Sequence, residues 1–422
     1  MDIIEYLRTL EVFHEISSPL GSAFIRPDVT RKHVQSCPEP PATCSWTSSS
    51  NLKRQSGWFK VMPRLPHALL LRARHISPLL PLVLRGTRTW DSAVNELRWL
   101  REHVEQTTTT RDSLLSPQKR LRILCERRAK GEPLQYILGS QPFGELDIKC
   151  QPGVLIPRPE TEVYTEYLAQ FINQHHVVFK TMIASAKSTS NPLRIVDLCS
   201  GTGCIPLLLH SLLSKTFTAL QIQGWDISQT AVSLARRNLR ENVKKGYLNA
   251  SPRISFEMVD IFSNLTSDQR ASLKCDILIS NPPYISNESF NNETTRSVRN
   301  WEPKLALVPN ISCSYSVLPQ DVFYARLVDF HFNLCQSKIL LMEIGDDEQA
   351  IRVVKILMDN LKRSTGSDLQ NNSIEIWRDW PGQASDQGEK QELVIEEVSV
   401  PVRGSGALRA VVSMRKIFPL NC

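Results

Sequence analysis

The part of this sequence best suited to chemistry is Asn281-Pro282-Pro283-Tyr284. It follows residues 275–280, an apolar run of the length of a β-strand. Because proline fixes φ and has no backbone N–H, the strand must end at the two prolines. Open α/β sheets bind their ligands at the carboxyl ends of strands. The stretch therefore predicts a rigid loop that could hold a planar amide or amine, although Asn-Pro is also a common turn pair.

A loop of small residues follows another predicted strand, residues 193–198. It consists of Asp197, Leu198, Cys199, Ser200, Gly201, Thr202 and Gly203. Small residues allow a backbone to pass close to a ligand. The lysine of a phosphate-binding loop is absent, and Cys199 stands where a dinucleotide fingerprint has its first glycine. Taken alone, the loop is equally consistent with an ordinary strand–turn–helix junction.

Two further acids follow predicted strands. Asp226 could accept both hydroxyls of a ribose, although Asp226 or Ser228 could instead cap the next helix. Asp260 could meet an adenine amino group, with Phe262 beside the ring. The small-residue loop, Asp226, Asp260 and Asn281 all fall at the carboxyl ends of four successive strands. Chance placement does not readily explain this arrangement.

Alternating strand and helix patterns position these side chains. Strands are predicted at residues 193–198, 220–225, 254–259, 275–280, 339–344, 373–378 and 410–414, and helices at 204–213, 230–242, 323–335 and 348–361. This alternation predicts a doubly wound, mostly parallel sheet of seven strands. Residues 383–408 are polar, and we expect an inserted loop between the last two strands.

The chain ahead of this sheet divides into three parts. Residues 1–61 are predicted to be a disordered extension, because residues 37–51 are rich in proline and serine. Residues 62–131 are predicted to form a small helical domain. Its two helices have buried faces of Ala93, Leu97, Leu100 and Val104, and of Leu121, Leu124, Cys125 and Arg128. Residues 132–160 contain short apolar runs between glycines and prolines, which predict a β-hairpin connector. The remaining residues, 161–422, are expected to form the domain that carries the sheet.

Composition limits the alternatives. The chain has 422 residues, a formal net charge of +7, and 41% hydrophobic and 22% charged residues, as is ordinary for a globular protein. Its longest apolar runs are too short to span a bilayer, so no membrane partner is expected. The ten cysteines form no CxxC pair or zinc-like cluster, which predicts a reducing compartment and no metal.

Four further stretches carry a resemblance to a known family. They are EPLQYILG at residues 132–139, VLIPRPETE at 154–162, WEPKLAL at 301–307 and LMEIG at 341–345. With the Asn281 loop, they resemble the release factor glutamine methyltransferases, which have the class I S-adenosylmethionine (SAM)-dependent fold. The likeness covers about residues 65–415, including the helical domain of the bacterial and organellar branch. Cys199-Ser200 departs from the usual Gly-Thr and is expected to be tolerated if the φ of Cys199 is negative.

The resemblance implies that SAM is the cofactor. The reaction would methylate the side-chain amide nitrogen of the glutamine in the Gly-Gly-Gln motif of a class I peptide chain release factor. It assigns SAM binding to Asp197, Cys199, Ser200, Gly201, Thr202, Gly203, Asp226, Asp260, Phe262 and Asn281. It assigns substrate binding to Asn281, Pro282, Pro283 and Tyr284, of which Asn281, Pro282 and Tyr284 are catalytic.

Two other functions stay open from the sequence. The same loop occurs in DNA or RNA adenine-N6 methyltransferases, but no Lys/Arg-rich stripe accompanies it here, so no direct nucleic-acid partner is expected. A non-catalytic assembly factor with this fold would be expected to lose Asp226 or Asn281, and both are present. Residues 62–90 are arginine-rich and contain no aspartate or glutamate, which predicts a mitochondrial location and Met62 as a possible start. A monomer is expected.

Overall fold

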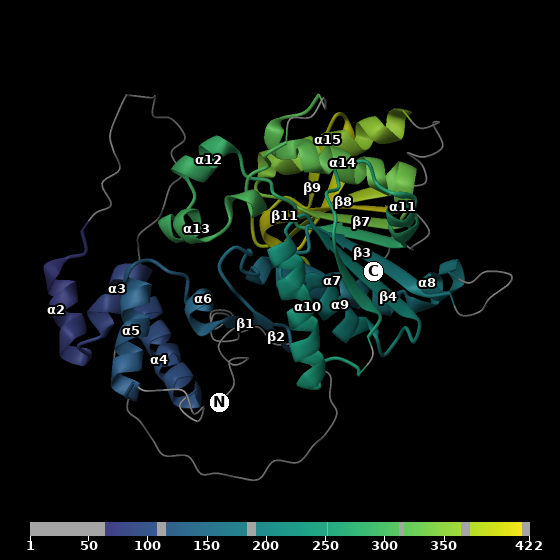
Figure 1. Ribbon diagram of the computed structural model, residues 1–422. Coiled ribbons are helices and arrows are strands. Elements are labelled where there is room, and N and C mark those ends of the chain that lie inside the picture. The colour runs from purple at the N-terminus through teal and green to yellow at the C-terminus, as the bar shows by residue number, and fades with distance from the viewer. Residues whose placement is uncertain are drawn as a thin grey trace, which may run out of the picture. The chain divides into compact units, whose positions relative to one another are not determined.

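A twisted sheet organises the part of the chain that the computed structural model describes (Figure 1). Among those residues it has nine strands in the order β5-β4-β3-β6-β7-β11-β8-β10-β9. The strands are β3 (Leu193–Leu198), β4 (Leu220–Asp226), β5 (Ile254–Met258), β6 (Ile277–Ser280), β7 (Ile339–Glu343), β8 (Asn372–Trp380), β9 (Glu392–Ile395), β10 (Val398–Arg403) and β11 (Ser405–Arg415). The five strands from β3 to β7 are all parallel to one another. Strand β11 runs antiparallel to both β7 and β8. The doubly wound, mostly parallel sheet is thus confirmed.

The structure describes residues 64–107, 115–183, 191–250, 252–311, 316–363 and 372–415. The predicted extension, residues 1–61, and the alternative start Met62 lie outside these residues. No helix among the described residues is both long and apolar enough to cross a membrane. The same residues contain no group of three or more His, Cys, Asp or Glu side chains that could hold a metal ion.

The prediction of a loop at residues 383–408 was wrong, because this segment contains strands β9 and β10. β10 pairs in parallel with β8, and β9 pairs antiparallel with β10, so the sheet has two strands beyond the expected seven. Val400 and Val402 are buried, whereas Val394 is 73% exposed. Strands at a sheet edge keep one face in solvent, which explains why this segment is polar enough to read as a loop.

Helices cover both faces of the sheet (Figure 1). Alternate residues of β6 separate the two faces: Ile277 and Ile279 belong to one buried cluster and Leu278 to the other. The first cluster includes residues of α7 (Pro159–Gln174), α8 (His176–Ile183), α9 (Cys204–Leu213) and α10 (Gln229–Lys244). The second includes residues of α14 (Val322–Asp329), the π-helical turn Phe330–Cys335 and α15 (Asp347–Arg363). Three short helices, α11 (Ser267–Ser272), α12 (Asn287–Asn292) and α13 (Arg296–Trp301), were not predicted.

Four helices form the front part of the described chain: α2 (His67–Ile76), α3 (Leu80–Thr87), α4 (Trp90–Thr107) and α5 (Pro117–Ala129). The predicted face of α4 is buried, with Leu100 at 0% exposure. On α5, Arg128 is buried and its guanidinium donates two hydrogen bonds to the Glu96 carboxylate, at 2.5 and 3.1 Å. This bidentate pair joins α4 to α5 and explains how an arginine can share an apolar face.

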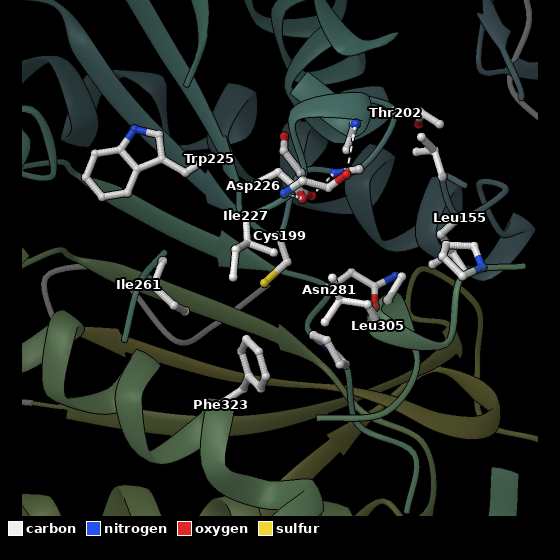
Figure 2. A pocket seen from close by; sticks show the side chains of 18 of the residues that line it. Leu155, Cys199, Thr202, Trp225, Asp226, Ile227, Ile261, Asn281, Leu305 and Phe323 are labelled. Atoms are coloured by element: carbon white, nitrogen blue, oxygen red, sulfur yellow. Dashed lines mark hydrogen bonds between the residues drawn. The ribbon is translucent and has the colours of Figure 1, made fainter. Parts of the chain in front are cut away.

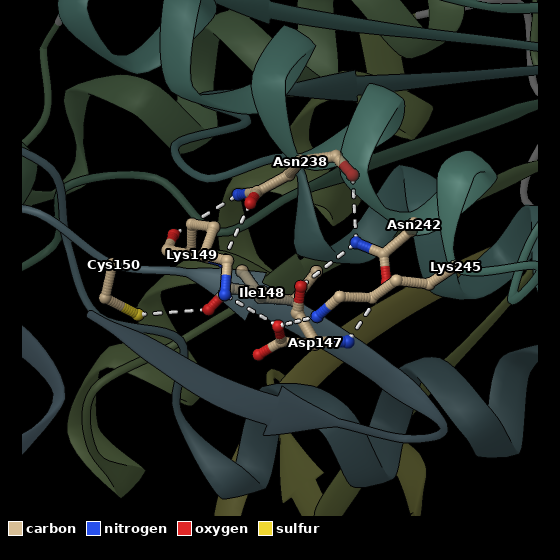
Figure 3. A network of polar contacts seen from close by, with 7 residues as sticks. All are labelled: Asp147, Ile148, Lys149, Cys150, Asn238, Asn242 and Lys245. Atoms are coloured by element: carbon tan, nitrogen blue, oxygen red, sulfur yellow. Dashed lines mark hydrogen bonds and ion pairs between the residues drawn. The ribbon is translucent and has the colours of Figure 1, made fainter. Parts of the chain in front are cut away.

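The connector contains a helix as well as the predicted hairpin. The hairpin consists of β1 (Ser140–Phe143) and β2 (Leu146–Lys149), but residues 134–138 form helix α6 (Leu134–Leu138) rather than an extended run. Gly139 ends α6 with a φ of 79°, a left-handed conformation that glycine adopts without strain. Two asparagines of α10, Asn238 and Asn242, hold the backbone of β2 (Figure 3).

Candidate functional site

A cavity of about 390 Å³ opens at the carboxyl ends of β3 to β6 (Figure 2). Its wall includes nine of the predicted site residues: Cys199, Ser200, Gly201, Thr202, Asp226, Asp260, Phe262, Asn281 and Pro283. Asp197, Gly203, Pro282 and Tyr284 do not belong to the wall. The last three each adjoin a wall residue in the chain, and Asp197 is hydrogen-bonded to the wall residue Ser200. The topology thus brings together four segments that lie between Cys199 and Pro283 in the chain. The Ser280 Oγ to Leu198 O bond, between residues 82 positions apart, links the ends of the strands that precede the first and the last of these segments.

The backbone of Cys199 differs from the expectation. Its φ is 63°, in the left-handed region, whereas the sequence argument required a negative value. Gly201 and Gly203 also have positive φ, at 54° and 77°. The turn therefore needs three left-handed residues within five positions, and only two of them are glycine. Cys199 adopts the conformation that the missing glycine would have adopted, which costs about 1–2 kcal/mol.

Asp226 organises the same loop. Its Oδ2 accepts a hydrogen bond from the Gly201 N–H at 2.8 Å, and its Oδ1 accepts one from the Ser228 N–H at 2.8 Å. The helix cap is Ser228, whose side chain accepts from the Ala231 N–H. Asp226 is therefore not the N-cap of α10. Each of its carboxylate oxygens keeps a lone pair for a ligand hydroxyl.

Buried carboxyl groups give this end of the sheet an unusual titration. Burial, with the neighbouring charge of Asp226, raises the pKa of Asp197 to about 8, although Asp197 Oδ2 accepts a bond from Ser200 Oγ at 2.5 Å. Burial also raises the pKa of Asp226, against the two backbone bonds that lower it. A positively charged ligand nearby would favour the ionised form of these carboxyls.

The far end of the cavity is apolar and aromatic. The rings of Phe262 and Phe323 meet edge to face with centroids 4.9 Å apart. Asp260 is exposed at the rim, and its Oδ1 accepts from the Phe262 N–H at 2.9 Å. Ile227, Ile261 and Phe323 line this end, and the sequence argument did not single them out as site residues. A flat apolar slot with a carboxylate at its rim suits a nucleobase that carries an amino group.

The Asn281 loop begins where β6 ends. Asn281 lies in the wall, and its Nδ2 donates to Thr161 Oγ1 at 3.4 Å. The Tyr284 hydroxyl donates to Glu343 Oε1 at 3.1 Å, and burial raises the pKa of Tyr284. In this arrangement Tyr284 stands behind the cavity wall. Its predicted contact with a substrate amide stays a prediction.

The connector and the start of α7 supply part of the cavity wall, which the sequence pattern does not indicate. Leu155, Arg158 and Thr161 line the cavity, as does Leu305 from the WEPKLAL stretch. Arg158 Nη2 lies 2.8 Å from Glu302 Oε1, and the Ile156 N–H donates to Glu302 Oε2 at 3.1 Å. Glu302 thereby ties the IPRPETE stretch to the WEPKLAL stretch. Both had been noted for their resemblance, but neither pattern alone indicates a binding wall.

These features fit SAM, which joins an adenosine to a positively charged tail. The cavity has the size of small-molecule sites. It offers a carboxylate with free lone pairs in Asp226, an aromatic slot at Phe262, and a loop that passes close to a ligand. A Cβ at Gly203 would come within 2.9 Å of Ala235 and Phe256, so the close approach of the loop and its neighbours requires glycine there.

Comparison with known proteins points the same way. Residues 179–300 match the family model described as "Methyltransferase small domain", and residues 86–139 match the model described as "PrmC N-terminal domain". The chain is similar to the mitochondrial MRF1 N(5)-glutamine methyltransferase MTQ1 of Saccharomyces cerevisiae, with 37% identity over 68% of this chain and 78% of the relative.

Two more relatives have comparable coverage. The probable MRF1 mitochondrial N(5)-glutamine methyltransferase of Schizosaccharomyces pombe is 30% identical over 70% of this chain and 90% of the relative. The release factor glutamine methyltransferase of Bifidobacterium longum is 36% identical over 62% of this chain and 76% of the relative. The chain therefore belongs to the release factor glutamine methyltransferases, a family of enzymes that use SAM as the methyl donor.

Proposed function

We propose that this enzyme methylates the side-chain amide nitrogen of the glutamine in the Gly-Gly-Gln motif of a mitochondrial class I release factor. One observation carries the proposal: Asn281 faces a SAM-sized cavity from the stiff end of a central strand. The relatives named above, two of them described as mitochondrial, support the substrate and the compartment.

Asn281 and Pro282 would bind and orient the substrate amide. An amide nitrogen is a weak nucleophile because its lone pair is shared with the carbonyl group. SAM, when bound, supplies an electrophilic methyl group on a sulfonium. Asn281 Oδ1 and the Pro282 carbonyl would each accept one hydrogen of the substrate amide, which orients the nitrogen and stabilises the positive charge that develops on it. Pro283 and Tyr284 would hold this loop and exclude water.

The other site residues would hold the cofactor. Asp226 would accept the ribose hydroxyls, Asp260 would accept the adenine amino group, and Phe262 would pack against the ring. The remaining residues of the small-residue loop would let its backbone pass close to SAM. They are Asp197, Cys199, Ser200, Gly201, Thr202 and Gly203. No histidine, cysteine or carboxylate nucleophile enters the mechanism.

The front helices would serve substrate recognition. Release factors are large proteins, and the reaction takes place on one side chain, so contacts outside the cavity would select the partner. Helices α2 to α5, within residues 62–131, carry many arginines that could meet an acidic surface. We further propose that the enzyme works as a monomer in mitochondria, without nucleic acid. Import of the Met1 and Met62 forms into isolated mitochondria tests the location.

Labelled SAM tests the function directly. The protein is incubated with SAM, a class I release factor and nucleic acid, and label is expected on the release factor glutamine. Asn281→Ala should keep SAM affinity within about threefold and lose methyl transfer by about 1,000-fold or more. Asp226→Ala is the matched control and should weaken SAM binding itself. Label on nucleic acid, no label at all, or near-normal turnover by Asn281→Ala would refute the proposal.

A further inference from the structure

A buried carboxylate lies directly behind the Asn281 loop. Glu343, at the end of β7, is 1% exposed, and each of its oxygens accepts a hydrogen bond from a different segment. Oε2 accepts from Thr161 Oγ1 at 2.7 Å, and Oε1 accepts from the Tyr284 hydroxyl at 3.1 Å. Glu343 thus joins the first turn of α7 to the loop that carries Asn281. Nothing in the proposed mechanism uses this group.

The hydroxyl of Thr161 has one proton, and Glu343 receives it. Toward any other neighbour Thr161 Oγ1 can therefore act only as an acceptor. That neighbour is Asn281, which lies 3.4 Å away. An acceptor selects the NH2 end of a carboxamide rather than its oxygen. Because Thr161 Oγ1 can only accept, the Asn281 group that points to it must be the donor, Nδ2.

This orientation determines what Asn281 offers to a ligand. Within the described part of the chain, Asn281 Oδ1 accepts no hydrogen bond from the protein. Thr161 and Asn281 both line the cavity. A carboxamide that rotated by a half turn would present two donors to a substrate amide that also carries two donors. The two NH2 groups would then repel, and the substrate nitrogen would not be held.

We propose that Thr161 is a positioning residue that, oriented by Glu343, fixes the Asn281 carboxamide with its oxygen toward the substrate amide. The role of Thr161 in methylation rests on the proposed function. The orientation of the Asn281 carboxamide can be tested without a release factor. Thr161 touches neither reacting atom. It acts through Asn281, and loss of its hydroxyl should leave the cofactor end of the cavity unchanged.

The test compares Thr161→Val, which keeps the shape and removes the hydroxyl, with Thr161→Ser, which keeps the hydroxyl. In Thr161→Val, kcat for release factor methylation should fall by about 10- to 100-fold, because a small misplacement near the chemistry has effects of that size. SAM affinity should stay within about twofold. In Thr161→Ser, kcat should return to within about threefold of wild type. A Thr161→Val kcat within twofold of wild type, or a Thr161→Ser variant as slow as Thr161→Val, would overturn the proposal.

A second readout needs no substrate. Protein labelled with 15N-asparagine gives side-chain NH2 signals, and the Asn281 pair is assigned from its absence in Asn281→Ala. Hydrogen exchange of this pair should be slow in wild type and Thr161→Ser, and several-fold faster in Thr161→Val. Equal exchange in all three proteins would refute the orientation. If wild type fails to methylate the release factor while the exchange pattern holds, the proposed function fails and the positioning role survives.

Discussion

Cys199 has a backbone conformation that residues with a Cβ rarely adopt. It adopts a φ of 63° in a loop where both other left-handed positions are glycines. A left-handed conformation costs a residue with a Cβ about 1–2 kcal/mol, and such strain persists only where the surroundings enforce it. Here a bond to the neighbouring strand β4 holds the turn, since the Ser200 N–H donates to the Trp225 carbonyl at 3.0 Å.

Replacement of Cys199 by glycine should therefore stabilise the protein. Cys199→Gly is expected to raise the free energy of unfolding by about 1 kcal/mol relative to Cys199→Ala, because only glycine removes the clash of Cβ with the backbone. The midpoint of thermal unfolding should rise by about 2 °C relative to Cys199→Ala. Calorimetry of the two variants measures the difference, and Cys199→Ala controls for the lost thiol. An equal or lower midpoint for the glycine variant would contradict the assigned strain.

At the scale of elements, two asparagines of α10 take the place of a neighbouring strand. Asn242 accepts from the Asp147 N–H and donates to the Asp147 carbonyl, both at 3.0 Å. Asn238 accepts from the Lys149 N–H at 2.7 Å (Figure 3). It also donates to the Thr202 carbonyl at 2.9 Å. Both side chains are fully buried. Of these two asparagines, Asn238 is thus the one that also joins the hairpin to the loop proposed to hold SAM.

The two positions should separate stability from cofactor binding. Asn238→Ala and Asn242→Ala should each lower the free energy of unfolding by about 1–3 kcal/mol, because each leaves buried backbone groups unpaired. Only Asn238→Ala should also weaken SAM, by about 3- to 10-fold, since it releases the Thr202 carbonyl. Denaturant titration and calorimetric SAM titration measure the two effects. Equal SAM affinity in both variants would show that the contact with Thr202 does not affect the site.

Periodicity explains why most elements were predictable from the sequence. The strands from β3 to β7 alternate with helices, and their buried runs are bounded by glycine, proline or polar residues, so local pattern was enough. It failed for α6, whose five residues are too few to express a helical period. It failed for β9 and β10, whose outward residues are exposed. Asp226, Asp260 and Asn281 were identified because they follow strands.

Other contacts of the site could not be read from local pattern. The bond between Asn281 and Thr161 joins residues 120 positions apart, and that between Thr161 and Glu343 spans 182. No spacing rule connects a threonine in a first helical turn to an asparagine after a distant strand. The positive φ of Cys199 depends on the whole turn, including its bond to β4, and so local propensity predicted the opposite sign.

At the scale of the whole molecule, buried ionisable groups should control how stability depends on pH. The folded pKa of Asp197 is about 8, above its ordinary value of 3.8, because of burial first and the charge of Asp226 second. Between these values the folded state holds a proton that the unfolded state has lost. Stability therefore falls as pH rises through this range. Burial raises the pKa values of Asp226 and Glu343, which act in the same direction.

Titration of His331 affects stability in the opposite direction and lowers the stability of the folded state at acidic pH. Burial, and to a smaller extent Arg415, lowers its pKa from 6.5 to about 3, and its Nδ1 lies 2.7 Å from Ser337 Oγ. The unfolded state then binds the extra proton, so its contribution to stability is complete above pH 6.5 and is lost as pH falls toward 3. Below pH 6.5 the histidine and the carboxyls oppose each other. As pH rises further, the contribution of Asp197 continues to fall until its folded pKa of about 8 is passed.

The SAM-free protein should therefore lose stability as pH rises from 6.5 to 8. Asp197 alone contributes a slope of at most about 1.4 kcal/mol per pH unit. Asp197→Asn removes the titrating group and should make this slope distinctly shallower, whereas Asp268→Asn, at an exposed carboxyl on α11, should leave it unchanged. Denaturant unfolding at half-unit pH intervals measures the three slopes. Stability that rises with pH in wild type, or a slope that Asp197→Asn leaves intact, would mean that Asp197 is ionised in the folded protein and that its burial is compensated by contacts other than the Ser200 hydroxyl.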